Sequence, residues 1–228
     1  MKKNYTSAPI LLSGLAALGL REGLYRAAVD SRGLLTPLHP LEIALWALTG
    51  LTLLGVLLLI RGGREPDAFP RSVAGLGTLV LAAAVIAAGM NTVQTLPAVG
   101  ALHRVFSWLA GAGLAGAAYF RWKGKPPVFG CHLSAAAFFA VHGVACYQSW
   151  SRDPQMMNYV FSLLGCICLA VFSYQQAAGE LGIGSRKMRL FSGWMGIFLC
   201  CAAIARGGWL YAAGALWMLT CLPEGARP

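Results

Sequence analysis

The stretch APILLSGLAALGLREGLYRAAVD, residues Ala8 to Asp30, places Arg21 and Glu22 directly after thirteen apolar or small residues. A helix needs about 20 apolar residues to cross a bilayer. The segment therefore has two interpretations. In the first, the membrane helix ends near Leu20, and the rest lies on the outer surface as an amphipathic segment. In the second, the helix continues and turns its charges toward an outward-facing cavity.

The composition places the whole chain in a membrane. Hydrophobic residues make up 57% of its 228 residues, charged residues only 11%, and the mean hydropathy is +0.64. Soluble domains carry about 25% charged residues. The net charge of +10 does not indicate nucleic-acid binding, because the basic residues lie in short gaps between apolar runs instead of forming one patch.

The apolar runs predict an all-α integral membrane protein with about eight transmembrane helices in a single polytopic domain, residues 1–228. The segment Leu12 to Arg26 also aligns with Leu133 to Gln148. This similarity suggests two tandem four-helix halves, residues 1–125 and 126–228, as a further level of organisation. Together with residues 8–30, the predicted membrane segments are residues 41–60, 73–93, 101–120, 128–150, 156–178, 190–204 and 209–222.

The basic residues predict the orientation. Twelve of the 18 Lys and Arg residues fall at the two termini and in the loops on the same side. By the positive-inside rule both termini are cytoplasmic, and we expect the plasma (inner) membrane of a prokaryote. The N-terminus resembles a secretory signal but lacks a convincing cleavage site, so an uncleaved first helix is expected. The other side carries Arg21, Arg26, Arg32, Arg104, Arg152 and Arg206.

The charges of the first helix have partners in sequence. Glu22, Arg26 and Asp30 are four residues apart and form one stripe of alternating sign. Arg21 and Arg32 are left over even when these charges pair, so the stripe is net basic. Glu42 has a structural interpretation, since Pro40 fits the first position of a helix and an acid in the first turn complements the helix dipole.

Three histidines lie in predicted membrane helices: His103, His132 and His142. They suggest a haem- or quinone-binding redox subunit as an alternative function, although buried histidines more often hydrogen-bond to neighbouring groups. The seven cysteines all lie in apolar runs and are interpreted as small hydrophobic residues. No cofactor, metal site or catalytic residue is predicted, because the chain has no phosphate-binding loop, catalytic triad or paired-carboxylate signature.

The excess of charge on the outer side supports the leading hypothesis, a transporter or ligand-binding membrane protein with an outward-facing polar cavity. Its partners would be the bilayer and a small anionic or zwitterionic molecule. A third class is an assembly protein that docks a membrane partner or a second copy through the outer amphipathic segment. The residues predicted to bind the small molecule are Arg21, Glu22, Tyr25, Arg26, Arg104, His142, Tyr147 and Arg206.

Overall fold

The computed structural model describes residues 7–28, 35–36, 39–64, 66, 69–91, 96–151 and 159–222. In these ranges the chain folds into eight helices and no β-sheet, which confirms the all-α prediction. The helices are α1 (Ala8–Ala27), α2 (Pro40–Arg61), α3 (Arg71–Met90), α4 (Pro97–Trp122), α5 (Phe129–Trp150), α6 (Val160–Glu180), α7 (Arg186–Gly207) and α8 (Trp209–Cys221).

The prediction of eight membrane-spanning helices is supported for five of them. Helices α2, α3, α5, α6 and α7 are long and apolar enough to cross a membrane. Helices α1 and α4 have sufficient length, 20 and 26 residues, but they are not among the helices that are apolar enough over their length. Helix α8 has only 13 residues, about 20 Å at 1.5 Å per residue, which is shorter than a hydrocarbon core. The five apolar helices indicate a membrane-embedded protein.

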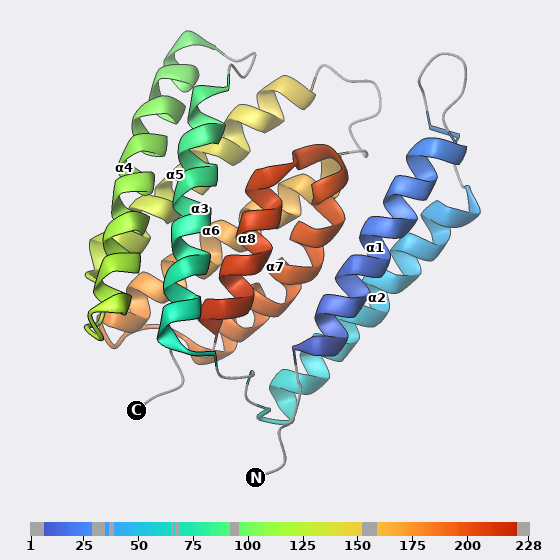
Figure 1. The fold of residues 1–228 in the computed structure, drawn as a ribbon. Helices are drawn as coiled ribbons and strands as arrows, with labels where there is room; N and C mark the ends of the chain where they lie inside the picture. Colours follow the sequence, from blue (N-terminus) through green and yellow to red (C-terminus); the bar gives the residue numbers. More distant parts are fainter. Residues whose placement is uncertain are drawn as a thin grey trace.

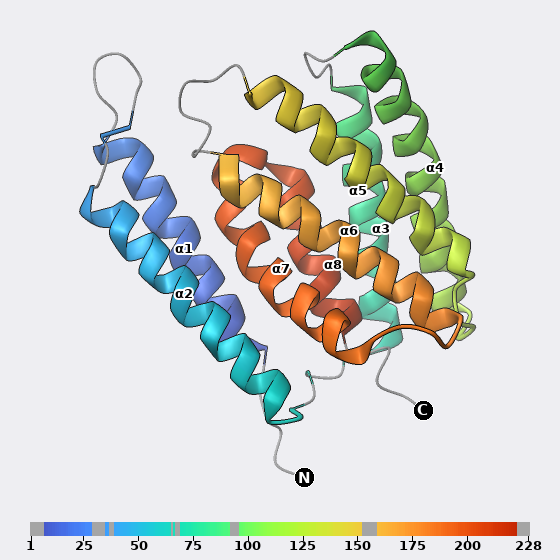
Figure 2. The same cartoon turned by 180° about the vertical axis from the view of Figure 1, so that it is seen from behind.

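Helices α3 to α8 form a closed ring in which each helix packs against the next, and α8 returns to α3 (Figure 1). Helices α1 and α2 form a hairpin that packs against α7 from outside this ring (Figure 2). We call the end at which α1, α3, α5 and α7 begin the inner end, following the predicted orientation, and the opposite end the outer end. The two predicted halves, residues 1–125 and 126–228, remain a prediction.

Helix α7 is the centre of the packing. It contacts α1, α2, α6 and α8, and 78% of its apolar span is buried, compared with 17% for α2. Its buried residues include Trp194, Ile197 and Phe198. The helix ends in a tight turn at Gly208, whose φ of +59° is a conformation that residues with a side chain rarely adopt. This turn folds α8 directly back against α7.

Close approach of neighbouring helices depends on small residues. A Cβ at Gly14 of α1 would lie 2.9 Å from the Cβ of Cys201 on α7. A Cβ at Gly89 of α3 would overlap the side chain of Ser107 on α4, which is fully buried. Small side chains at such contacts allow helix backbones to pack closely in a membrane, where van der Waals packing replaces the hydrophobic effect as the driving force.

The substitution Gly89→Ala tests this packing. We expect it to lower the free energy of unfolding by about 1 to 3 kcal/mol, because the added methyl group overpacks the contact with Ser107. Gly50→Ala on α2 is the matched control, since a Cβ there would meet no side chain and no neighbouring helix within 4 Å. Thermal unfolding in detergent measures both variants, and equal stability of the two would contradict the packing described here.

Candidate functional site

Arg21 is the most deeply buried of the predicted ligand-binding residues. Only 2% of its surface is exposed, and its Nη1 donates a hydrogen bond of 2.7 Å to the carbonyl oxygen of Ala202 on α7. Burying a cation is costly unless polar or aromatic partners compensate it. The carbonyl oxygen supplies such a partner and fixes the guanidinium at the outer end of the bundle.

The backbone of α1 explains how Arg21 reaches α7. Gly14 brings the two helices into close contact, and α1 continues without interruption through Arg21 to Ala27. The helix therefore has no break near Leu20, while the position along α1 at which the membrane ends stays a prediction. The helix stays regular because the cation finds its partners inside the protein and does not need to turn toward the surface.

Aromatic rings surround the guanidinium. The Cζ atom of Arg21 lies 5.3 Å from the ring centroid of Phe161 on α6 and 5.7 Å from that of Tyr25. The Cζ atom of Arg206, at the end of α7, lies 4.4 Å from the centroid of the same tyrosine ring. Such contacts stabilise a cation near an aromatic face. Three predicted residues, Arg21, Tyr25 and Arg206, thus meet at the outer end.

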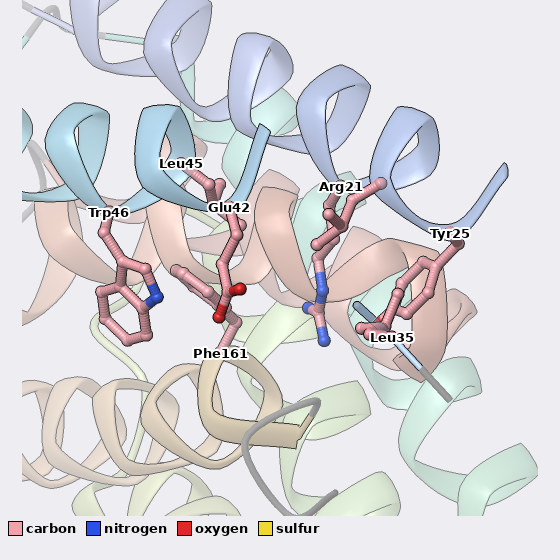
Figure 3. Close-up of a pocket in the computed structure, with 8 residues that line it drawn as sticks. Arg21, Tyr25, Leu35, Glu42, Leu45, Trp46 and Phe161 are labelled. Carbon is pink, nitrogen blue, oxygen red and sulfur yellow. The ribbon is translucent and has the colours of Figure 1, made fainter. Parts of the chain in front are cut away.

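A pocket opens beside Arg21 between α1, α2 and the start of α6. It encloses about 360 Å³, including the space at its open mouth. In Figure 3 the Arg21 guanidinium and the Glu42 carboxylate point into the same space, with Tyr25 beside the arginine and Trp46 beside the glutamate. We call this the outer pocket. Its lining residues are Arg21, Leu24, Tyr25, Leu35, Glu42, Leu45, Trp46 and Phe161.

Glu42 is placed in the outer pocket by the start of α2. Pro40 occupies the first turn, and the side chain of His39 accepts a hydrogen bond of 3.3 Å from the backbone N–H of Leu41. Glu42 lies in this turn, as the sequence predicts, and it is half-buried. Among the described residues its carboxylate forms no ion pair or hydrogen bond. Glu42 therefore lies where it complements the helix dipole, and it also lines the outer pocket.

The other predicted site residues lie elsewhere. Glu22 and Arg26 form a solvent-exposed pair at 3.9 Å on α1 and do not line the outer pocket. Arg104 is exposed on α4, and Tyr147 is 47% exposed beside Trp150 at the end of α5. Whether any of these residues binds a ligand remains a prediction. Asp30, Arg32 and Arg152 lie outside the described residues.

His142 faces α4 instead of the outer pocket. Its Nδ1 lies 2.9 Å from Nε2 of His103, and its Nε2 lies 3.4 Å from the sulfur of Cys146. One imidazole must donate to the other, so the two nitrogens are joined by a shared hydrogen. A separation of 2.9 Å leaves no room for an iron between them, and this arrangement of the pair does not fit ligation of one haem by both rings.

A second polar cluster, at the inner end, was missed by the sequence analysis. Arg121 of α4 donates hydrogen bonds to Thr78 Oγ1 on α3, at 2.9 Å, and contacts Nε2 of His132 on α5 at 3.3 Å. Glu180 of α6 lies 3.4 Å from the same histidine nitrogen. Both charged residues lie just beyond the predicted membrane segments 101–120 and 156–178, whereas the structure includes them in the last turns of α4 and α6. No glycine or proline stands between Phe120 and Gly124, which is the sequence signal that the helix continues through Arg121.

The described residues contain no group of three or more His, Cys, Asp or Glu side chains placed to hold a metal ion. No protein-family model matches the chain, and searches of curated proteins and of solved structures found no match. The geometry of the two clusters therefore decides which of them is the candidate site. Arg121 is held by side chains of other helices, whereas Arg21 borders a pocket, which makes the outer pocket the candidate site.

The substitution Arg121→Leu tests the structural role of the inner cluster. We expect it to lower the free energy of unfolding by about 3 kcal/mol, because two hydrogen bonds from a charged donor are lost at buried partners. The exposed Arg104→Leu serves as control and should change stability by less than about 0.5 kcal/mol. Unfolding in mixed micelles measures both, and an Arg121→Leu protein as stable as the control would contradict this role.

Proposed function

We propose that the protein is a multi-pass plasma-membrane protein, with both termini in the cytoplasm, that binds a small anionic or zwitterionic molecule in the outer pocket and serves its transport. The observation that carries this proposal is the buried guanidinium of Arg21 at the wall of the pocket. Ionisable residues inside membrane helices are costly and usually have a function.

The guanidinium is suited to hold an anion. Its planar fork presents several N–H donors in a fixed geometry that matches a carboxylate or phosphate. The Ala202 carbonyl and the rings of Tyr25 and Phe161 hold the group in place before a ligand enters. A donor group that is already positioned loses little conformational freedom on binding, which favours affinity.

The remaining walls favour a ligand with an apolar part. Leu24, Leu45, Trp46 and Phe161 contribute apolar or aromatic surface to the pocket. Small-molecule sites combine such surface with a few polar groups. The pocket has an open mouth, so a ligand can place its charged groups inside while its apolar part lies against these walls.

The position of the pocket favours transport over a purely structural role. It lies between the α1–α2 hairpin and α6, and the hairpin packs mainly against one helix of the ring, α7. Motion of this hairpin relative to the ring would change access to the pocket. Transporters commonly move one helical unit against another around a fixed binding site.

The substitution Arg21→Gln tests the proposal. Isothermal titration of the detergent-purified protein with leucine and with 4-methylpentanoate should show binding of at least one of them. Gln keeps a hydrogen-bonding side chain but removes the charge, and a lost charged hydrogen bond of about 1.5 to 3 kcal/mol weakens affinity by roughly 10- to 150-fold.

Arg61→Gln is the matched control, because this arginine is exposed at the inner end of α2 and does not line the outer pocket. Its affinity should equal that of the unmodified protein. The melting temperature without ligand shows whether Arg21→Gln still folds. Equal affinities of a folded Arg21→Gln protein and the control, or no binding of either compound, would refute the proposal.

A further inference from the structure

Glu42 places a negative charge opposite the arginine in the outer pocket. Both side chains line the same pocket and point into the same space (Figure 3), yet among the described residues no ion pair joins them. Of the described groups none forms an ion pair or hydrogen bond with the Glu42 carboxylate. The pocket therefore offers one positive and one negative group to any molecule that enters it.

This pair of charges discriminates between classes of ligand. A simple carboxylate would bind Arg21 but would bring its negative charge close to Glu42. A simple amine would bind Glu42 but would bring its positive charge close to Arg21. Like charges in a partly buried site repel more strongly than in water, because the surrounding dielectric constant is lower. A molecule that carries both an anionic group and an ammonium group satisfies both walls.

We infer that Glu42 selects for an ammonium group, so that the ligand of the outer pocket is a zwitterion with an apolar body. This inference rests on the proposed function and specifies the ligand class of the same site. The anionic group binds Arg21, the ammonium group binds Glu42, and the apolar body lies against Leu45, Trp46 and Phe161. Specificity of this kind comes from the repulsion of wrong ligands as much as from attraction of the right one.

Two sources supply this chemistry: a free amino acid with an apolar side chain, and the ethanolamine headgroup of a phospholipid. Both carry an ammonium group close to an anionic group. The pocket lies at the outer end, where the predicted orientation puts the outer leaflet, and Trp46 is 38% exposed. Trp side chains are common at membrane interfaces.

The experiment compares three probes of similar shape. Leucine carries both charges, 4-methylpentanoate lacks the amine, and 3-methylbutylamine lacks the carboxylate. Isothermal titration of the full chain, in nanodiscs of phosphatidylglycerol, should give a dissociation constant for leucine at least about tenfold below those of the other two. In the Glu42→Gln protein, the dissociation constants of leucine and 4-methylpentanoate should be about equal.

Glu22→Gln tests the competing acid, because the sequence also predicts Glu22 as a ligand-binding residue. Glu22 belongs to the same end of the bundle but pairs with Arg26 on the exposed face of α1 and does not line the outer pocket, so the inference predicts that its loss leaves the tenfold preference unchanged. The comparison of leucine with 4-methylpentanoate in the unmodified protein needs no variant, and it tests the inference even where Glu42→Gln does not fold.

The outcomes separate this inference from the proposed function. Equal affinity of the unmodified protein for leucine and 4-methylpentanoate, with both weakened by Arg21→Gln, would overturn the role of Glu42 and leave the proposed anion site standing. Loss of the preference in Glu22→Gln but not in Glu42→Gln would also overturn it. Binding of none of the three probes would refute the proposed function itself, and the inference with it.

Nanodiscs that contain phosphatidylethanolamine distinguish the two sources. A lipid headgroup in the pocket would compete with leucine and abolish its binding in these discs, whereas a site for a free amino acid would bind leucine equally in both kinds of disc. Either result agrees with the ammonium requirement measured in phosphatidylglycerol discs, because both sources carry an ammonium group.

Discussion

A guanidinium inside an apolar helix needs partners within the protein, and this requirement organises the outer end of the bundle. Arg21 finds the carbonyl oxygen of Ala202 on α7 and the ring of Phe161 on α6. One side chain of α1 therefore contacts two helices, α6 and α7, that are far from it in sequence. It also explains why α1 stays straight past Leu20 although its second half carries charges.

The same contact depends on the packing of α7. Small residues on α7 and Gly14 on α1 bring the two backbones close enough for the arginine to reach a main-chain oxygen. Helix α2 then follows α1 as a hairpin and places Glu42 across from Arg21. The outer pocket thus forms where the hairpin meets α6 and α7. Its positive charge comes from α1 and its negative charge from α2.

The sequence allowed the helices to be predicted but not their neighbours. Apolar runs located all eight helices to within a few residues, and Pro40 correctly indicated the start of α2. Periodicity shows which face of a helix is apolar, but not which helix it meets. Hence the contacts of Arg21 with Ala202 and of His103 with His142 could be identified only from the folded structure. Arg121 lies just beyond the predicted segment 101–120, and its partners Thr78 and His132 on other helices could not be inferred from sequence.

The most direct test of the central claim is to locate a bound zwitterion on the protein. Photo-leucine, a leucine analogue with a diazirine on its side chain, can be crosslinked by light to the purified protein, and the adducts can be mapped by mass spectrometry. The account predicts adducts in peptides that contain Leu24, Leu45 or Phe161, and competition by unlabelled leucine. Adducts concentrated at the inner end near His132, or spread without competition, would contradict it.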